Sequence, residues 1–129
     1  VGTICDASTT TYLMTRWGHP ITDGGLGIER VIEMLTRRNA RHMGLNDRGE
    51  IAVGLRADLN LIDPSRLDTG EPQIVRDLPA GGRRLLQKGE GYLGTWVAGQ
   101  AVARHGEVMS ARPGRLVRLS ADSSRSRSR

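Results

Sequence analysis

The sequence predicts a mixed α/β chain in which helices come first and a series of short β-strands follows. Three observations support this prediction. Apolar side chains recur every three or four residues over 28–43, which is typical of a helix that buries one face. After Gly44 the apolar side chains alternate instead, as they do in a half-buried strand. Glycine and proline stand between the alternating segments, where they favour turns.

Two helices are expected in the first third of the chain. One is predicted over 7–17, after a short strand or loop over 1–5, and a loop over 18–27 follows it. Gly44 suits the left-handed position that ends the second helix, and Leu45 is placed to pack back on the last turn. The apolar stripe of that second helix consists of Ile28, Val31, Ile32, Leu35, His42 and Met43.

The segments beyond Gly44 are predicted to form short strands joined by tight turns. Gly99-Gln100 is interpreted as a hairpin turn, because glycine supplies the positive φ that such a turn requires. The predicted strands cover 50–53, 57–62, 73–77, 83–87, 92–99, 101–106 and 114–119.

The positive charge of the chain is confined to its last part. Residues 111–129 hold six arginines and one aspartate, so the remaining 13 basic and 13 acidic side chains leave residues 1–110 neutral. A nucleic-acid partner is therefore not expected for the body of the chain. Residues 120–129 form an Arg-Ser tail that is predicted to be disordered, because it lacks apolar side chains to bury.

The sequence shows no metal or catalytic motif. His19, His42 and His105 are isolated, and His-x-His, H-E-x-x-H and C-x-x-C spacings are absent. His42 is interpreted as a partly buried histidine on the helix stripe and His105 as an exposed residue before a turn. Cys5, the only cysteine, favours a reducing compartment, the cytoplasm, and no apolar run is long enough to cross a membrane.

The stretch "NARHMGLNDRGEIAVGLRADLNLID" (39–63) resembles the place where metal-dependent amidohydrolases leave their barrel. In those enzymes the last barrel helix ends at a Gly-Leu pair, a glycine-containing turn follows, and an Ala-Asp pair begins a strand of a small β-sandwich. Val53 stands where the family usually has proline. The matching residues here are Gly44-Leu45, Gly49, Ile51, Gly54 and Ala57-Asp58-Leu59.

Further matches look like the N-acyl-D-amino-acid deacylase branch of that family. They are "GTICDAS" (2–8), "VRDLPAGGRRLLQKGEGY" (75–92), the T-x-V-x-G pattern of 95–99 and "PGRLVR" (113–118). The resemblance implies an α/β fragment: the last loop and helices of a (β/α)8 amidohydrolase barrel, followed by the C-terminal strands of a small β-sandwich. It divides the chain into a barrel end (1–46), sandwich strands (47–119) and the tail (120–129).

The resemblance also implies where the chemistry lies. In the branch a zinc ion at the C-terminal ends of the barrel strands polarises the amide and activates water, and an aspartate after the last strand transfers the proton. Neither that aspartate nor the zinc ligands match residues of this chain, so no catalytic or metal residue is expected in it. The loop that follows the aspartate borders the substrate pocket, and this loop lacks the arginine that holds the substrate carboxylate in some members. The expected pocket-border residues are Thr3, Cys5, Asp6 and Ser8.

Two functional hypotheses follow. The first is that the chain is part of a zinc-dependent hydrolase of N-acyl (D-)amino acids or similar amides, inactive alone and completed by the missing N-terminal part of the same protein. The alternative is a non-catalytic β-rich interaction module whose Arg-Ser tail binds RNA or an acidic partner. Under the first hypothesis the helix over 28–43 and the open strand edges lack their partner surfaces, so the chain alone is expected to be marginally stable or to self-associate.

Overall fold

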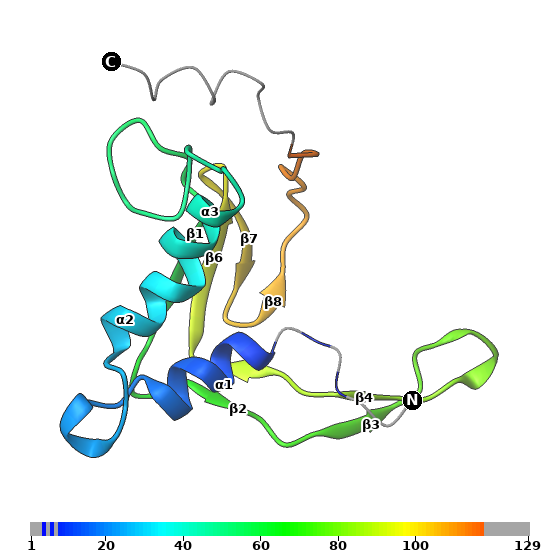
Figure 1. Cartoon of the computed structure of the whole chain (residues 1–129). Helices are drawn as coiled ribbons and strands as arrows, with labels where there is room; N and C mark the ends of the chain where they lie inside the picture. The colour runs from blue at the N-terminus through cyan, green and yellow to red at the C-terminus, as the bar shows by residue number, and fades with distance from the viewer. Residues whose placement is uncertain (1–3, 5, 7, 118–129) are drawn as a thin grey trace, which may run out of the picture.

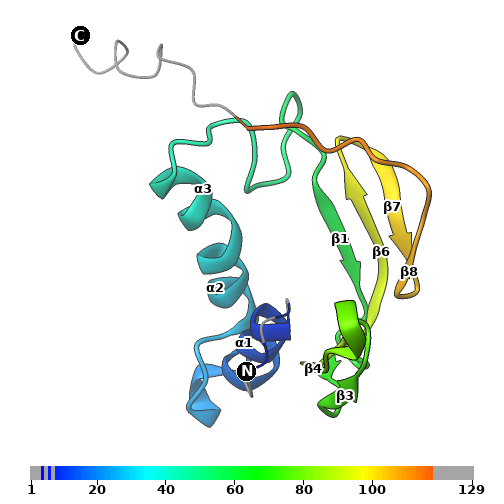
Figure 2. The same cartoon turned by 90° about the vertical axis from the view of Figure 1, so that its right-hand side faces the viewer.

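The computed structural model describes residues 4, 6 and 8–117. The expected strand or loop over 1–5, apart from Ile4, and the tail over 120–129 lie outside the described residues. Within the described part, the helices stand on one side and a four-stranded sheet on the other, joined by a loop at one end and by small β-ladders near α1 at the other (Figures 1 and 2). None of the described helices has the length and hydrophobicity to span a bilayer.

The helical side matches the predicted elements closely. Helix α1 covers Ser8–Trp17 and is followed by a short 3-10 turn, Ile21–Asp23. The second predicted helix is a continuous run made of α2 (Ile28–Glu33), a π-helical turn (Met34–Arg38) and α3 (Asn39–His42). Side-chain hydrogen bonds to backbone carbonyls accompany the widened turn: the Thr36 hydroxyl donates to Ile32 O at 2.7 Å.

The end of this helix confirms the position predicted for Gly44, whereas the packing of the Leu45 side chain stays a prediction. Gly44 has φ +69°, and its N–H donates to Arg41 O at 3.1 Å. The Leu45 N–H donates to Ala40 O at 2.8 Å, which completes the pair of hydrogen bonds that closes a helix with a left-handed residue. The chain thus leaves the helix in a fixed direction, toward the loop that leads to the sheet.

The main sheet is antiparallel throughout, with the strand order β1-β6-β7-β8. Of two small two-stranded ladders, β2–β5 lies beside α1, and β3–β4 continues beyond it, away from the helices (Figure 1). A 3-10 turn, Pro79–Gly81, separates β3 from β4. The strands are β1 (Leu59–Ile62), β2 (Asp68–Thr69), β3 (Gln73–Val75), β4 (Arg84–Leu86), β5 (Gly89–Glu90), β6 (Tyr92–Val97), β7 (Gln100–Arg104) and β8 (Glu107–Val108).

Two of the predicted strands are wrong. Residues 50–53 lie in a loop between Gly49 and Gly54, both of which have positive φ. The segment therefore pairs with no strand. Residues 114–117 are described and form no strand, because they cross the end of the sheet instead of pairing with an edge (Figure 2). The predicted residues 118–119 lie outside the described part.

The predicted hairpin exists, with its turn one residue earlier than expected. Ala98 (φ +50°) and Gly99 (φ +77°) are the two turn residues, and Gln100 already begins β7 opposite Val97. His105 (φ +48°) and Gly106 (φ +81°) form a second turn in which both residues have positive φ. His105 is exposed, as predicted. The prediction for His42 is wrong: it lies in the last helical turn and faces solvent.

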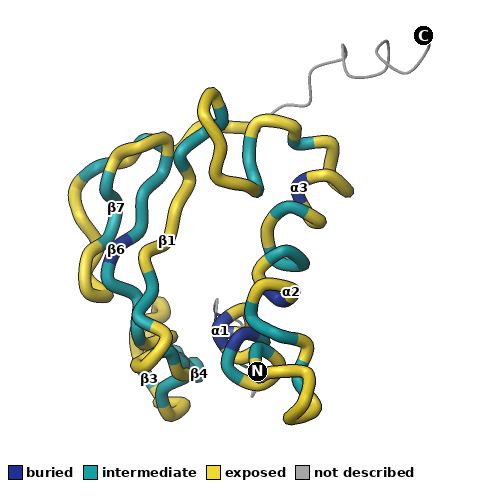
Figure 3. Tube along the Cα trace, turned by 90° about the vertical axis from the view of Figure 1, so that its left-hand side faces the viewer, coloured by how far each residue is buried: buried dark blue, intermediate teal, exposed yellow. Residues whose placement is uncertain are grey.

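Little of the apolar surface is covered. Among the described residues, the buried hydrophobic side chains are Met14, Val31 and Ala40 (Figure 3). Of the predicted helix stripe, Val31 is fully buried, whereas Ile32 and Met43 are exposed by 43% and 59%. A cavity of about 460 Å³ separates the two sides, lined by Met14, Ile32 and Leu35 from the helices and by Leu59, Ile62 and Tyr92 from the sheet. The helices and the sheet therefore do not close over a common core.

Candidate functional site

Asp58, from the "GLRADLNLID" stretch, connects three segments of the chain. Its carboxylate accepts the Ala98 N–H at 2.8 Å, the Arg56 Nε–H at 3.0 Å and the Arg48 guanidinium at 3.1 Å. Because Ala98 belongs to the β6–β7 turn and Arg48 to the loop after the helices, one carboxylate fixes both at the start of β1. The Gly99 N–H donates to Ala57 O at 2.9 Å beside it. These contacts give the Ala-Asp pair of the resembled motif a structural role.

A second set of hydrogen bonds joins the N-terminal segment to the strands. The Asp6 carboxylate accepts the N–H of Ser8 at 3.2 Å and that of Gln87. The Ser8 hydroxyl donates to Gln87 Oε1 at 3.0 Å. Thr11 Oγ1 and Tyr92 Oη lie 2.8 Å apart, with Thr11 buried. This polar seam holds α1 against the chain that runs from β4 to β6.

The electrostatics of Asp6 follow from this seam. The Gln87 N–H lowers the pKa of Asp6 below its ordinary value of 3.8, against the opposing effect of burial. The Ser8 hydrogen bonds and the positive charge of Arg84 act in the same direction as Gln87. The Asp6 carboxylate therefore stays charged and accepts hydrogen bonds that position the backbone of Ser8 and Gln87.

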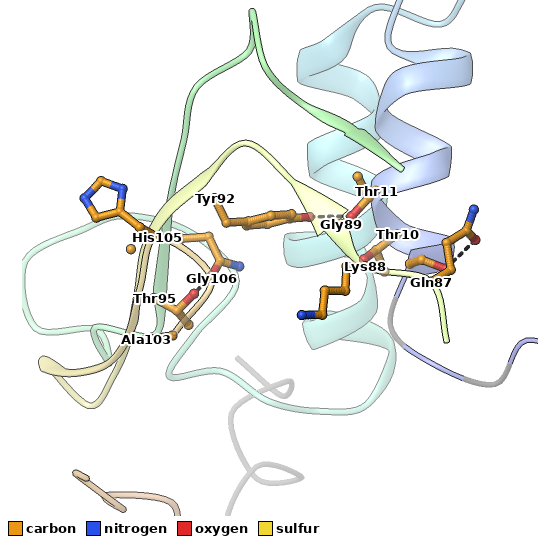
Figure 4. A pocket seen from close by; sticks show the side chains of 13 residues that line it. Thr10, Thr11, Gln87, Lys88, Gly89, Tyr92, Thr95, Ala103, His105 and Gly106 are labelled. Carbon is orange, nitrogen blue, oxygen red and sulfur yellow. Dashed lines mark hydrogen bonds between the residues drawn. The ribbon is translucent and has the colours of Figure 1, made fainter. Parts of the chain in front are cut away.

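The structure places two of the four predicted pocket-border residues. Thr3 and Cys5 lie outside the described residues, and Asp6 and Ser8 are brought together at the start of α1. Ser8 lines a cavity of about 450 Å³ between α1 and the sheet (Figure 4). The other polar residues around it, which sequence reasoning missed, include Gln87, Lys88, Tyr92, Thr95 and His105. Within the resemblance, the "QKGEGY" run and the first residue of the T-x-V-x-G pattern, Thr95, lie in this region.

The described residues do not fit a metal site. His19 lies in the loop after α1, His42 in α3 and His105 in the turn between β7 and β8. No group of three or more His, Cys, Asp or Glu side chains within the described part could hold a metal ion. The acidic groups that do cluster, Asp47 and Asp58, are bound by arginines.

Comparison with known proteins decides the family. The sequence model described as the amidohydrolase family matches residues 1–103. The chain belongs to the amidohydrolase family. An allantoinase of Solibacter usitatus (strain Ellin6076) is 29% identical to it over 132 residues, which cover 94% of this chain and 26% of the relative. The chain thus spans about a quarter of the length of the curated relative it matches. No solved structure matches the chain.

The family match covers most of the elements of this amidohydrolase chain. The matched range includes the helices, the Asp58 junction and β1 to β6, and it ends near the end of β7. The predicted mixed α/β chain and its relation to amidohydrolases are confirmed. The deacylase branch, the barrel and the β-sandwich remain predictions.

Replacing Asp58 by alanine is expected to loosen the hairpin. The Ala98 N–H loses its acceptor, and Arg48 and Arg56 lose their shared partner, so the Ala98 amide should exchange with solvent at least about tenfold faster. Amide hydrogen exchange followed by NMR measures this. Asp23→Ala, which removes an exposed carboxylate from the turn after α1, is the control. Unchanged exchange at Ala98 in the Asp58 variant would contradict the assigned junction.

The seam at Asp6 predicts a pH dependence. Because the pKa of Asp6 is lowered in the folded chain, its contribution to stability is complete above the ordinary value of 3.8 and is lost as the pH falls through the folded value. In an NMR titration the Gln87 amide should therefore move with a midpoint below 3.8. Asp6→Asn should abolish that titration and Asp23→Asn should preserve it. A midpoint at or above the ordinary value would overturn the seam.

Proposed function

We propose that this chain is the C-terminal part of a hydrolase that cleaves the amide bond of N-acyl (D-)amino acids or of similar small amides. The observation that carries the proposal is the family match over residues 1–103, together with a chain that spans only 26% of its relative. In this proposal the helices α1 to α3 close a barrel, and the strands from β1 onward belong to the adjoining β-sandwich.

The uncovered apolar faces support this arrangement. The cavity of about 460 Å³ opens between Ile32 and Leu35 on one side and Leu59 on the other, and Leu61 on β1 is 53% exposed. Covering such surface contributes roughly 25 cal/mol per Å², so the rest of a barrel and sandwich would be a strongly stabilising partner. The missing N-terminal part of the same protein is the partner that we propose.

The described residues contain no group of three or more His, Cys, Asp or Glu side chains that could hold a metal ion, so a zinc ion of the whole protein would need ligands from outside them. What this chain contributes to the site is the segment around α1. The bonds from Asp6 and Ser8 to Gln87 fix the backbone of that segment, and Thr3, Cys5, Asp6 and Ser8 are proposed to border the substrate pocket. Gln87 itself is anchored by a hydrogen bond from its amide to Gly70 O at 3.0 Å.

The complete reading frame tests this proposal. We expect it to encode a Ser-Asp pair within about ten residues upstream of Val1 and His-x-His ligands near its start, as the resemblance implies. The purified complete protein should hydrolyse N-acetyl-D-amino acids, measured as released amino acid, and lose this activity on metal chelation. The 129-residue chain should bind no stoichiometric zinc by metal analysis and show no hydrolysis.

Control substrates and variants test the proposed substrate class independently of the family assignment. Allantoin belongs in the substrate panel, because the curated relative is an allantoinase. Hydrolysis of allantoin and of no N-acyl amino acid would refute the proposed substrate class. Ser8→Ala, which breaks the bond to Gln87, should lower the rate of the complete protein, whereas Thr9→Ala at an exposed neighbouring position should not.

A further inference from the structure

Three arginines, one from the loop before β1 and two from the C-terminal segment, line one cavity at the end of the main sheet. The cavity has a volume of about 350 Å³ and lies beside the β6–β7 turn, where the C-terminal segment crosses the sheet (Figure 2). Its lining consists of Arg56, Ala98, Gln100, Arg112, Pro113, Gly114 and Arg115.

The guanidinium groups of this arginine cluster (Arg56, Arg112 and Arg115) are only partly used. Arg56 donates its Nε–H to Asp58 at 3.0 Å. Arg112 donates from one terminal nitrogen to the carbonyl oxygens of Met109 and Ala111. Arg115 forms no hydrogen bond or ion pair within the described part of the chain. Since each guanidinium has five N–H donors, most of the donors in the cluster lack a protein acceptor there.

The local charge is positive. Asp58 is the only carboxylate in the described part that pairs with any of the three arginines, and it also neutralises Arg48. Asp47, the next carboxylate, is bound by Arg48. Bringing like charges together without counter-charge is unfavourable, and a bound anion would relieve it. The balance is four arginines against two aspartates, an excess of two positive charges: Arg48, Arg56, Arg112 and Arg115 against Asp47 and Asp58.

We propose that the arginine cluster binds a phosphate group, either as inorganic phosphate or as part of a small phosphorylated ligand. Guanidinium groups bind phosphate oxygens through paired N–H donors, and several of them around one cavity suit a dianion better than a carboxylate. The Gln100 amide adds a further polar group to the lining. The site is separate from the proposed amide-cleaving function and does not depend on it.

Inorganic phosphate added to the complete protein at constant ionic strength tests the site. The amide signals of Ala98, Gln100 and Gly114 should shift and saturate in NMR spectra, whereas acetate should bind at least about tenfold more weakly. Arg112→Ala combined with Arg115→Ala should weaken phosphate binding by at least about tenfold. The matched control is Arg38→Ala combined with Arg41→Ala, which removes two exposed arginines from the helices.

Several outcomes would overturn the proposal. Shifts that grow linearly without saturation, or that respond equally to acetate, would show general charge screening. Equal binding by the cluster variant and the helix variant would place the phosphate elsewhere. Saturable binding of a phosphorylated compound without binding of free phosphate would retain the site and identify the larger ligand.

Discussion

The Asp58 carboxylate is the interaction on which the arrangement of this chain depends. The helical run ends at Gly44 in a fixed direction, and the following loop must then deliver the chain to β1. Asp58 receives that loop through Arg48 and the β6–β7 turn through Ala98. Without this junction, the sheet would be attached to the helices mainly by the polar seam at Gln87. In this chain the Ala57-Asp58 pair thus has a structural role, because it joins the loop, β1 and the β6–β7 turn.

The two sides that Asp58 and Gln87 connect remain largely uncovered, and this constrains the function. A metal-dependent hydrolase site needs a cage of metal ligands, and the described residues contain no group of three or more such side chains. What they assemble is a frame, in which helices and strands are positioned by hydrogen bonds and leave apolar faces such as Ile32 and Leu61 exposed. A frame of this kind, in an amidohydrolase chain about a quarter the length of its relative, is the basis of the function proposed above.

Local patterns in the sequence predicted part of this frame. The helical run of α2 and α3 and its ending at Gly44 are encoded within a few residues, and the hairpin turn lies one position before the predicted one. Residues 50–53 and 114–117 were mistaken for strands, because alternation alone does not supply a pairing partner. The hydrogen bond from the Gln87 N–H to the Asp6 carboxylate connects residues 81 positions apart, and the arginine cluster places Arg56 and Arg115 around one cavity. No local pattern encodes such contacts, so the polar seam and the arginine cluster could be found only in the three-dimensional structure.

Amide hydrogen exchange in residues 28–42, compared between the isolated chain and the complete protein, tests the central claim most directly. If the apolar face of these helices is completed by the rest of an amidohydrolase, their amides should exchange rapidly in the isolated chain, which should also self-associate or melt without a sharp transition. In the complete protein the same amides should be strongly protected. A monomeric isolated chain that melts cooperatively and protects the helix amides by itself would contradict the account.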